Sequence, residues 1–326
     1  MLIMKIPFLS NLFKRHKRVG ADFVIALSGN GAHGAQVKFV AGRPQVVAYA
    51  FHGATGSKSS GVTPALLEKV RKSVRAGDLQ CATLLVPGEY QLLQVEAPNV
   101  PEDELKAAVR WSIKDMLNYH VDDATLDVLR IPVNQGAGDR KKSIYVVVAP
   151  SDLIKKRTEL FTRANINLRV IDIPEMAQRN IAALYEHDGR ALALLAFDES
   201  GGLLTFTSDG ELYLARRIEI SAGQLQDANE TLRQQYIDRL ELELQRSIDH
   251  FDRQFSHLPL RRLLVSAPDN SGIVAMLANS LDLPVERLDL NEVMDLSEMP
   301  DLANDETRVF ALHALGAALR QEGRES

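Results

Sequence analysis

Cysteine and tryptophan are scarce in this sequence, and it has no excess of positive charge. Of its 326 residues, one is cysteine and one is tryptophan. Cys81 has no second cysteine to pair with and belongs to no cysteine cluster, which is typical of a protein in a reducing compartment. The net charge of −5 predicts no nucleic-acid partner, because such partners select strongly basic domains or stripes.

Long apolar runs are missing as well. No run approaches the roughly 18 uninterrupted apolar residues that a bilayer-spanning helix needs. In residues 1–18 the cations follow the apolar positions instead of preceding them, and no small-residue cleavage site comes after, so we expect no secretory signal. Together these absences predict a cytoplasmic protein, long enough for two domains.

Signatures of known catalytic chemistry are also missing. The eight histidines are scattered, and none is spaced with cysteine or carboxylates as metal ligands are. The sequence contains no Walker A motif and no G-x-S-x-G. Glu241, Glu243 and Asp249 lie on a charged helix face and are interpreted as solvated. We therefore expect no catalytic residues and no metal site.

The first residues form a short amphipathic segment. Leu9 and Phe13 recur with Ile6 and Leu12 at near-helical spacing, and Lys14 and Arg15 open a basic run. Such a segment can lie on an anionic membrane surface, with Leu9, Phe13, Lys14 and Arg15 in contact with it. The alternative is a frayed terminus that packs one or two apolar residues.

One strand pattern occurs twice. An apolar strand at 23–27 leads into the turn 28–31 and a hairpin of residues 35–40 and 45–51. A second apolar strand at 191–197, about 170 residues later, leads into another glycine-containing turn and another hairpin. The repetition indicates two related α/β halves. The alternative is a chance recurrence, which is common in mixed α/β chains.

A helix beginning at Pro101 carries the single tryptophan. Pro101 and the three acids after it are typical of a helix start, because acids suit the positive end of the helix dipole. Leu105, Val109, Ile113 and Met116 mark one apolar face, and Trp111 falls close to the opposite side. Two interpretations stay open. Trp111 packs against another element of its own domain, or it anchors a partner.

Four segments carry a resemblance to a known family; they are 107–115 (AAVRWSIKD), 121–128 (VDDATLDV), 171–180 (IDIPEMAQRN) and 244–249 (LQRSID). Over residues 20–320 the chain resembles the MshI family, biogenesis proteins of the mannose-sensitive haemagglutinin (MSHA) pilus, a type IV pilus. More distantly it resembles PilM and the cytoplasmic domain of type II secretion component L.

The resemblance implies an α/β fold of the actin-like (ribonuclease H-like) class, with two duplicated halves and an inserted subdomain. The expected division is an amphipathic segment at 1–20, a first half at 21–190 with the insert at 99–165, and a second half at 191–321.

An actin-like ATP site uses two Asp-x-Gly turns. Their backbone amides bind phosphate, and their aspartates coordinate magnesium. In the first turn, this sequence has Ala26 at the position of the acid and Ser28 at the position of the glycine. In the second turn, Ala196 stands at the position of the acid and Asp198 at that of the glycine. The adenine turn would fall at 266–269, where Pro268 lacks an amide donor. We expect no cofactor. If ATP and Mg²⁺ do bind, the candidate contacts are Ser28, Gly29, Gly31, Ser200, Gly201 and Gly202.

The resemblance further implies a non-enzymatic scaffold of the inner-membrane platform that assembles a type IV pilus. The expected partner is the cytoplasmic N-terminal peptide of a bitopic PilN-like protein, bound between the first half and the insert, with Trp111 and Asp115 contributing. Other platform proteins and further copies of this chain are also expected partners. The expected location is cytoplasmic, peripheral at the inner membrane of a Gram-negative bacterium. The alternative function is an ATP-binding switch that regulates the same assembly.

Overall fold

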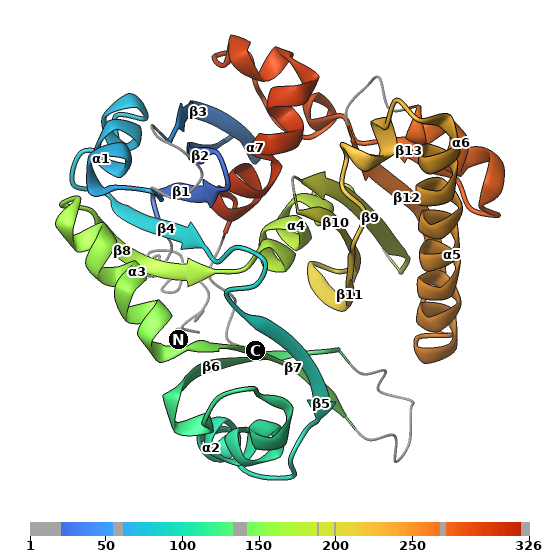
Figure 1. Ribbon diagram of the computed structural model, residues 1–326, viewed down its shortest axis with the longest axis horizontal. Helices are drawn as coiled ribbons and strands as arrows, with labels where there is room; N and C mark the ends of the chain where they lie inside the picture. Colours follow the sequence, from blue (N-terminus) through green and yellow to red (C-terminus); the bar gives the residue numbers. More distant parts are fainter. Residues whose placement is uncertain are drawn as a thin grey trace, which may run out of the picture.

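The computed structural model describes residues 21–320 except 55–60, 133–141, 188, 199 and 268–271, and the side chains of residues 303, 305 and 306 are not described. The amphipathic segment, with Leu9, Phe13, Lys14 and Arg15, lies outside the described residues. Two five-stranded sheets stand on either side of a pair of helices, and a three-stranded sheet forms a third unit (Figure 1).

The first sheet has the strand order β3-β2-β1-β4-β8. Its elements are β1 (Phe23–Ser28), β2 (Gly31–Val40), β3 (Arg43–Gly53), β4 (Gln80–Leu84) and β8 (Asn167–Asp172), with α1 (Pro64–Ser73) and α3 (Ser151–Arg163) on one face. The first three strands are antiparallel, whereas β4 and β8 run parallel to β1.

Successive side chains of β1 point to opposite faces of this sheet, and both faces are buried. Phe23 and Ile25 are buried with Phe161 of α3, and Val24 and Ala26 are buried on the opposite face. Because both faces of this central strand are covered, its sequence is a continuous hydrophobic run.

The second sheet repeats this topology in the order β11-β10-β9-β12-β13. Its elements are β9 (Ala191–Asp198), β10 (Gly201–Ser208), β11 (Glu211–Ile218), β12 (Leu260–Ser266) and β13 (Val285–Arg287), with α5 (Glu230–Gln254) and α6 (Ile273–Ser280). Again three antiparallel strands are followed by two parallel ones. The predicted duplication into two α/β halves is confirmed.

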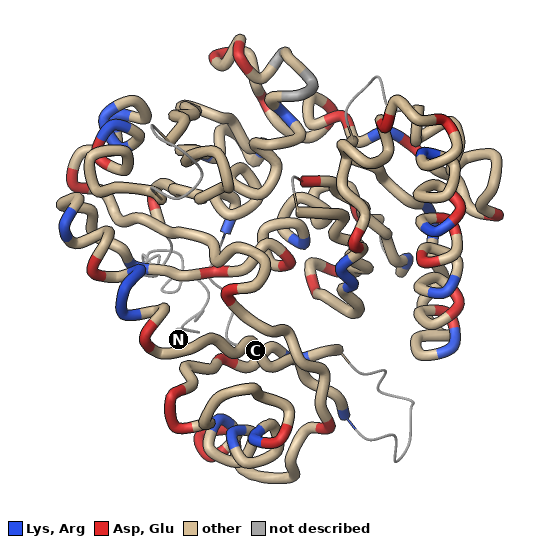
Figure 2. The backbone as a smooth tube through the Cα atoms, in the orientation of Figure 1, with Lys and Arg blue, Asp and Glu red and all other residues tan. Residues whose placement is uncertain are grey.

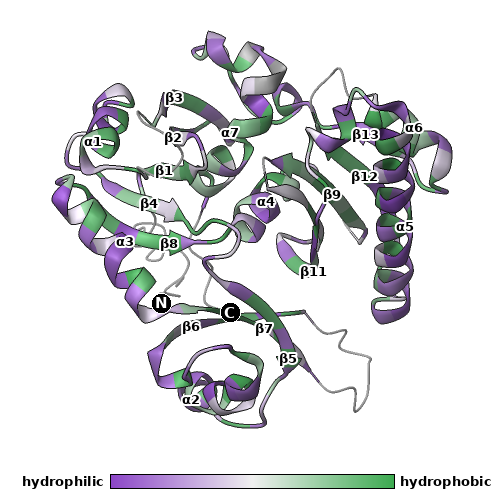
Figure 3. Ribbon diagram, viewed as in Figure 1, coloured by the Kyte–Doolittle hydropathy of each residue, from purple (hydrophilic) through white to green (hydrophobic). Residues whose placement is uncertain are grey.

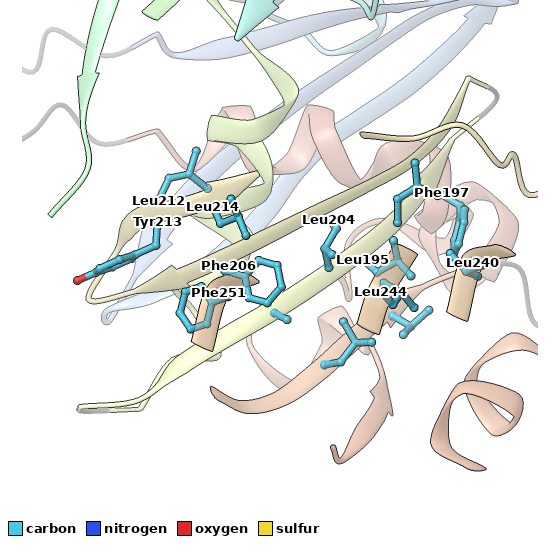
Figure 4. Packing of buried hydrophobic residues seen from close by; sticks show 14 of the residues in the cluster. Leu195, Phe197, Leu204, Phe206, Leu212, Tyr213, Leu214, Leu240, Leu244 and Phe251 are labelled. Carbon is cyan, nitrogen blue, oxygen red and sulfur yellow. The ribbon is translucent and has the colours of Figure 1, made fainter. Parts of the chain in front are cut away.

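Helix α5 covers the outer face of the second sheet (Figure 4). Leu240, Leu244 and Phe251 are fully buried on it, and the ring of Phe251 stacks on Phe206 with centroids 4.7 Å apart. Asn229 caps the helix by accepting hydrogen bonds from two backbone amides of the first turn. The strands of this sheet are mostly hydrophobic and α5 mostly hydrophilic on its visible side (Figure 3), as an amphipathic covering helix requires.

The third sheet interrupts the first half between β4 and α3. Its elements are β5 (Gln91–Glu96), β6 (Ala124–Arg130), β7 (Ser143–Pro150) and α2 (Glu102–Ile113), with short 3₁₀ turns at Lys114–Met116 and Val121–Asp123. Leu105, Val109 and Ile113 of α2 pack on the sheet. The sequence placed the insert at 99–165. However, α3 packs with the first sheet and stands where α6 stands in the second half, so the inserted unit spans 91–150.

Helices α4 (Pro174–Ala182) and α7 (Asp305–Ala318) cross between the two sheets, and 3₁₀ turns at Gln224–Gln226, Leu290–Glu292 and Pro300–Ala303 complete the second half. One buried cluster joins both helices to the inner faces of both sheets. A Cβ atom on Gly316 would lie 2.2 Å from the carbonyl oxygen of Ala177, so only glycine allows the two helices to come this close. The two halves therefore share a core.

Candidate functional site at the junction of the halves

The first predicted phosphate turn is a closed hairpin. Ser28 pairs with Gly31, which leaves a two-residue turn, and the Ser28 hydroxyl donates to Asn30 Oδ1 at 2.8 Å. The Asn30 carbonyl accepts from the amide of Ala54 at 2.8 Å. Gly31 is required by the neighbouring strand, because a Cβ atom there would lie 2.2 Å from the His52 carbonyl oxygen.

The residue at the acid position of this turn, Ala26, is also part of the folded core. Ala26 lies in the core shared with α4 and α7 and is 7% exposed. It carries no oxygen that could hold a metal ion or orient a water. The residues of the first turn thus serve strand pairing.

The second turn is occupied by a carboxylate of the chain itself. Asp198 Oδ1 accepts hydrogen bonds from the Ser200 amide at 2.7 Å, the Ser200 hydroxyl at 2.5 Å and the Gly201 amide at 3.1 Å. In a phosphate-binding turn such amides point at the anion. Here Asp198 stands in the anion's place, and Ala196 at the acid position is buried.

A small pocket lies at the described part of the predicted adenine turn. Ser266 and Ala267, at the end of β12, line a cavity of about 20 Å³ together with Arg287 and Arg308. Arg287 donates to the Ala267 carbonyl at 3.2 Å. A cavity of this size holds about one water molecule. Pro268 and Asp269 lie outside the described residues.

A charged chain crosses the junction beside these turns; it consists of the buried Glu175 and the half-buried Tyr90, Arg217 and Asp198. The Tyr90 hydroxyl donates to Glu175 Oε2 at 2.5 Å. Arg217 lies 3.8 Å from Glu175 Oε1 through Nε and 3.7 Å from Asp198 Oδ2 through Nη1. The chain joins the linker before β5, the start of α4, β11 and the second turn.

Burial dominates the electrostatics of this chain. It raises the pKa of Glu175 above its ordinary value, while the charge of Arg217 and the hydrogen bond from Tyr90 oppose the shift. Burial also raises the pKa of the Tyr90 phenol, and the charge of Glu175 raises it further. Glu175 is therefore held by specific partners at a position that is 3% exposed. Removing either partner would leave a buried charge uncompensated.

Gln178 and His313 continue the polar contacts towards α7. The Gln178 amide donates to the Leu194 and Leu203 carbonyl oxygens at 2.6 and 3.0 Å, and its oxygen lies 3.4 Å from His313 Nε2. Burial lowers the pKa of His313 to about 4, with Asp198 opposing and Arg217 reinforcing the shift. A neutral His313 can donate to the Gln178 oxygen in one of its tautomers.

The sequence analysis missed the charged chain. Glu175 follows Pro174 and looks like an ordinary acid at a helix start. Tyr90 and Arg217 are distant in sequence, and each is compatible with a strand or its flank. The sequence gives no signal that singles out Glu175, because α4 also carries Gln178, Arg179 and Asn180.

The predicted partner residues lie on the third unit. Trp111 is 71% exposed on α2, so it does not pack into its own domain. Asp115 follows in the 3₁₀ turn and is exposed. The structure thus leaves the tryptophan available to a partner and places Asp115 about one helical turn away.

Metal and membrane features can be checked only where residues are described. Within those ranges, no group of three or more histidine, cysteine or acidic side chains is arranged to hold a metal ion. Cys81 is buried, and burial raises the pKa of its thiol. None of the helices in the described part combines the length and apolar character needed to cross a bilayer.

Comparison with known proteins gives structural matches. No protein-family profile matches the sequence, and no curated protein matches it. A chain of the PilM–PilN type IV pilus biogenesis complex superposes with a TM-score of 0.72 at 16% identity, covering 92% of this chain and 98% of that one. The cytoplasmic domain of EpsL, an inner-membrane component of the type II secretion system of Vibrio cholerae, gives a TM-score of 0.47 at 14% identity, covering 92% and 95%.

A protein of Bacteroides thetaiotaomicron with an actin-like ATPase fold gives a TM-score of 0.46 at 11% identity, covering 86% of this chain and 94% of that one. The duplicated five-stranded sheets with crossing helices between them define the actin-like fold. Within that fold, the chain is similar to the matched chain of the PilM–PilN complex over almost its whole length.

Proposed function

We propose that this protein is a non-enzymatic scaffold of the inner-membrane platform that assembles a type IV pilus of the MSHA kind, and that it binds the cytoplasmic N-terminal peptide of a bitopic PilN-like protein. The observation that carries the proposal is the carboxylate of Asp198 on the amides of the second turn. The chain is similar in fold to a chain of a pilus biogenesis complex, and a carboxylate of its own accepts hydrogen bonds from the amides of the turn that the sequence aligns with a phosphate turn.

Loss of the nucleotide site supports a scaffold over an ATP-binding switch. Alanine stands at both acid positions, and both alanines are buried. Mg²⁺ binding beside a phosphate depends on carboxylates. A cleft that neither binds phosphate nor coordinates magnesium would not close on ATP. We therefore assign no catalytic residue and no cofactor.

The linker that leads into the third unit is anchored to the first half, which supports a role as a platform. Arg157 of α3, which is 7% exposed, donates to the Leu84 carbonyl at 2.9 Å and to both Glu89 oxygens at 2.6 Å. Glu89 and Tyr90 belong to the linker that leads into the third sheet. A preorganised surface binds a flexible peptide at a lower entropic cost. In this proposal the chain has three parts, residues 1–20, 21–190 and 191–321. The inserted unit lies within the second part and spans residues 91–150.

We assign the partner peptide to the exposed side of α2, with Trp111 and Asp115 contributing. The expected space between the first half and the third unit is separated from Trp111 by the third sheet, because α2 packs on one face of that sheet and Tyr145 and Val147 on its other face pack against the rest of the molecule. An exposed tryptophan is a frequent interface anchor. Asp115 adds a negative charge that would suit a basic peptide residue. The proposed location is cytoplasmic and peripheral at the inner membrane.

Fluorescence anisotropy with a labelled peptide tests this function. The probe is the synthetic cytoplasmic N-terminus of the PilN-like protein of the same bacterium. We expect saturable binding, weakened about 10-fold or more by Trp111→Ala. Leu242→Ala is the matched control, because Leu242 is another exposed apolar side chain, 49% exposed on α5. No binding by the unmodified protein would refute the partner, and equal affinities for both variants would refute the placement on α2.

A further inference from the structure

The third unit is inserted in the chain of the first half but packs against the second half (Figure 1). Both of its connections, from β4 into β5 and from β7 into α3, lead to the first half. On the face of the third sheet opposite α2, Tyr145 lies in the buried cluster that holds the core of the second half, and Leu92, Leu129 and Val147 pack against that cluster. The unit therefore contacts a half to which it has no direct connection along the chain.

The centre of the face that meets the second half is apolar. β7, the middle strand of the third sheet, carries no charged residue, and its register places Tyr145 beside Leu129. The charged residues on this face are Asp127 on the edge strand β6 and Glu96 at the end of β5, and both are exposed. Figure 2 shows the charged residues of the third unit mostly on α2 and the turns near it. The sheet thus covers the second half with its apolar centre.

The Tyr145 side chain makes polar contacts within this apolar centre. Its hydroxyl donates to the Tyr213 carbonyl oxygen at 3.4 Å and accepts a hydrogen bond from the Ala215 amide at 3.3 Å. Tyr145 is 3% exposed, and burial raises the pKa of its phenol to about 12. The hydroxyl therefore keeps its proton at any ordinary pH. One side chain of the third unit holds two backbone groups of β11.

These two backbone groups belong to an edge strand. β11 stands first in the order β11-β10-β9-β12-β13, so one of its sides has no partner strand among the described residues. Tyr213 and Ala215 present a carbonyl oxygen and an amide on that side, as an edge strand does to a neighbouring strand. The Tyr145 hydroxyl takes the place of the missing strand. Covering an edge in this way prevents its pairing with another chain.

A groove beside these contacts shows that the closure is incomplete. Its volume is about 310 Å³, and its lining residues come from α2 and β6 on one side and from α4 and β11 on the other. α2 and the third sheet share a buried cluster of their own, so the unit can move as one body. Its linker is fixed at Tyr90, whose hydroxyl donates to Glu175, so such a movement begins after this residue.

We propose that the third unit is a latched arm, which turns between Tyr90 and Ser151 and is held closed by the Tyr145 hydroxyl on β11. In the closed state the arm covers the edge of the second sheet and fixes the orientation of α2. In the open state it exposes that edge together with Leu92 and Val147. The inference goes beyond the proposed function and does not depend on the partner peptide.

Distances between spin labels test the latch in the full-length protein. One pair of labels joins Ser112→Cys on α2 with Asp252→Cys on α5, and a reference pair joins Lys69→Cys on α1 with Asp252→Cys. The three positions are exposed, whereas the native Cys81 is fully buried and does not take the label. The first pair reports the position of the arm relative to the second half. The reference pair reports the position of the two halves relative to each other.

The test variant is Tyr145→Phe, which removes the hydroxyl and keeps the ring. The matched control is Tyr119→Phe in the same unit, because the described residues offer the Tyr119 hydroxyl no hydrogen-bond partner. Circular dichroism verifies the fold of both variants. Amide exchange of the peptide that covers β11 is measured in each of them, because this strand loses a hydrogen-bond acceptor in the test variant alone.

We expect Tyr145→Phe to widen the α2–α5 distance distribution about 2-fold and to raise amide exchange in β11 about 10-fold. The α1–α5 distribution should not change, because α4 and α7 still join the two halves. Tyr119→Phe should change none of these quantities. Unchanged α2–α5 distances and unchanged exchange in Tyr145→Phe would overturn the proposal, since the arm would be held without the hydroxyl. An equal change in Tyr119→Phe, or a wider α1–α5 distribution, would overturn it too, because the movement would not belong to the latch.

Discussion

At the scale of single residues, the second turn depends on one carboxylate. Asp198 satisfies the amides of Ser200 and Gly201 and lies beside Arg217. We expect Asp198→Ala to lower the free energy of unfolding by about 1–3 kcal/mol, because the amides and the guanidinium lose a charged acceptor. Urea titration measures the change. Asp152→Ala, which removes an exposed ion pair with Lys156, is the control and should change stability by less than about 1 kcal/mol. Equal effects of the two substitutions would refute the role given to Asp198.

Two histidines make stability depend on pH. Burial lowers the pKa of both His33 and His313 to about 4 from an ordinary 6.5. The unfolded chain therefore binds more protons between these values, and stability is complete above about pH 6.5 and declines as pH falls towards 4. Glu175 acts in the opposite direction, because its raised pKa lets the folded state take up a proton first.

We expect a loss of roughly 1–2 kcal/mol for each histidine between about pH 7 and pH 5, measured as the shift in urea midpoint. His33→Gln should reduce the pH dependence of the midpoint. A midpoint that does not change over this interval would contradict the burial of both rings.

At the scale of elements, the crossing of α4 and α7 is the tightest contact between the halves. In an exposed helix, Gly→Ala stabilises by about 0.5–1 kcal/mol. At Gly316 we expect the opposite sign, a loss of about 2 kcal/mol or more, because the new methyl group would meet the Ala177 carbonyl. Thermal unfolding measures it, and Ser112→Ala on the exposed side of α2 should change stability by less than about 0.5 kcal/mol. A gain in stability for Gly316→Ala would show that the helices cross less closely.

Helices and strands also show where sequence reasoning succeeded. The apolar runs of β1 and β9 identified both central strands and, through their repetition, the two halves. The boundary of the insert was misplaced because the apolar stripe of α3 says that it covers a sheet, without saying which one. Phe161 packs against the first sheet, and that contact depends on the return of the chain after β7.

At the scale of the whole molecule, the two halves and the crossing helices form a continuous core, and the two turns beside it are held by hydrogen bonds within the chain. The sequence predicted the loss of both acids from Ala26 and Ala196. It could not predict that Asp198 fills its own turn, or that Tyr90, Glu175 and Arg217 meet there, because these contacts join strands and helices that are distant along the chain.

Calorimetric titration of the folded protein with ATP and Mg²⁺ tests the central claim most directly. We predict no saturable heat up to about millimolar ATP, because Asp198 already accepts hydrogen bonds from the amides of the second turn. Saturable binding with a Kd in the micromolar range would contradict it, and would mean that the junction opens to admit a nucleotide.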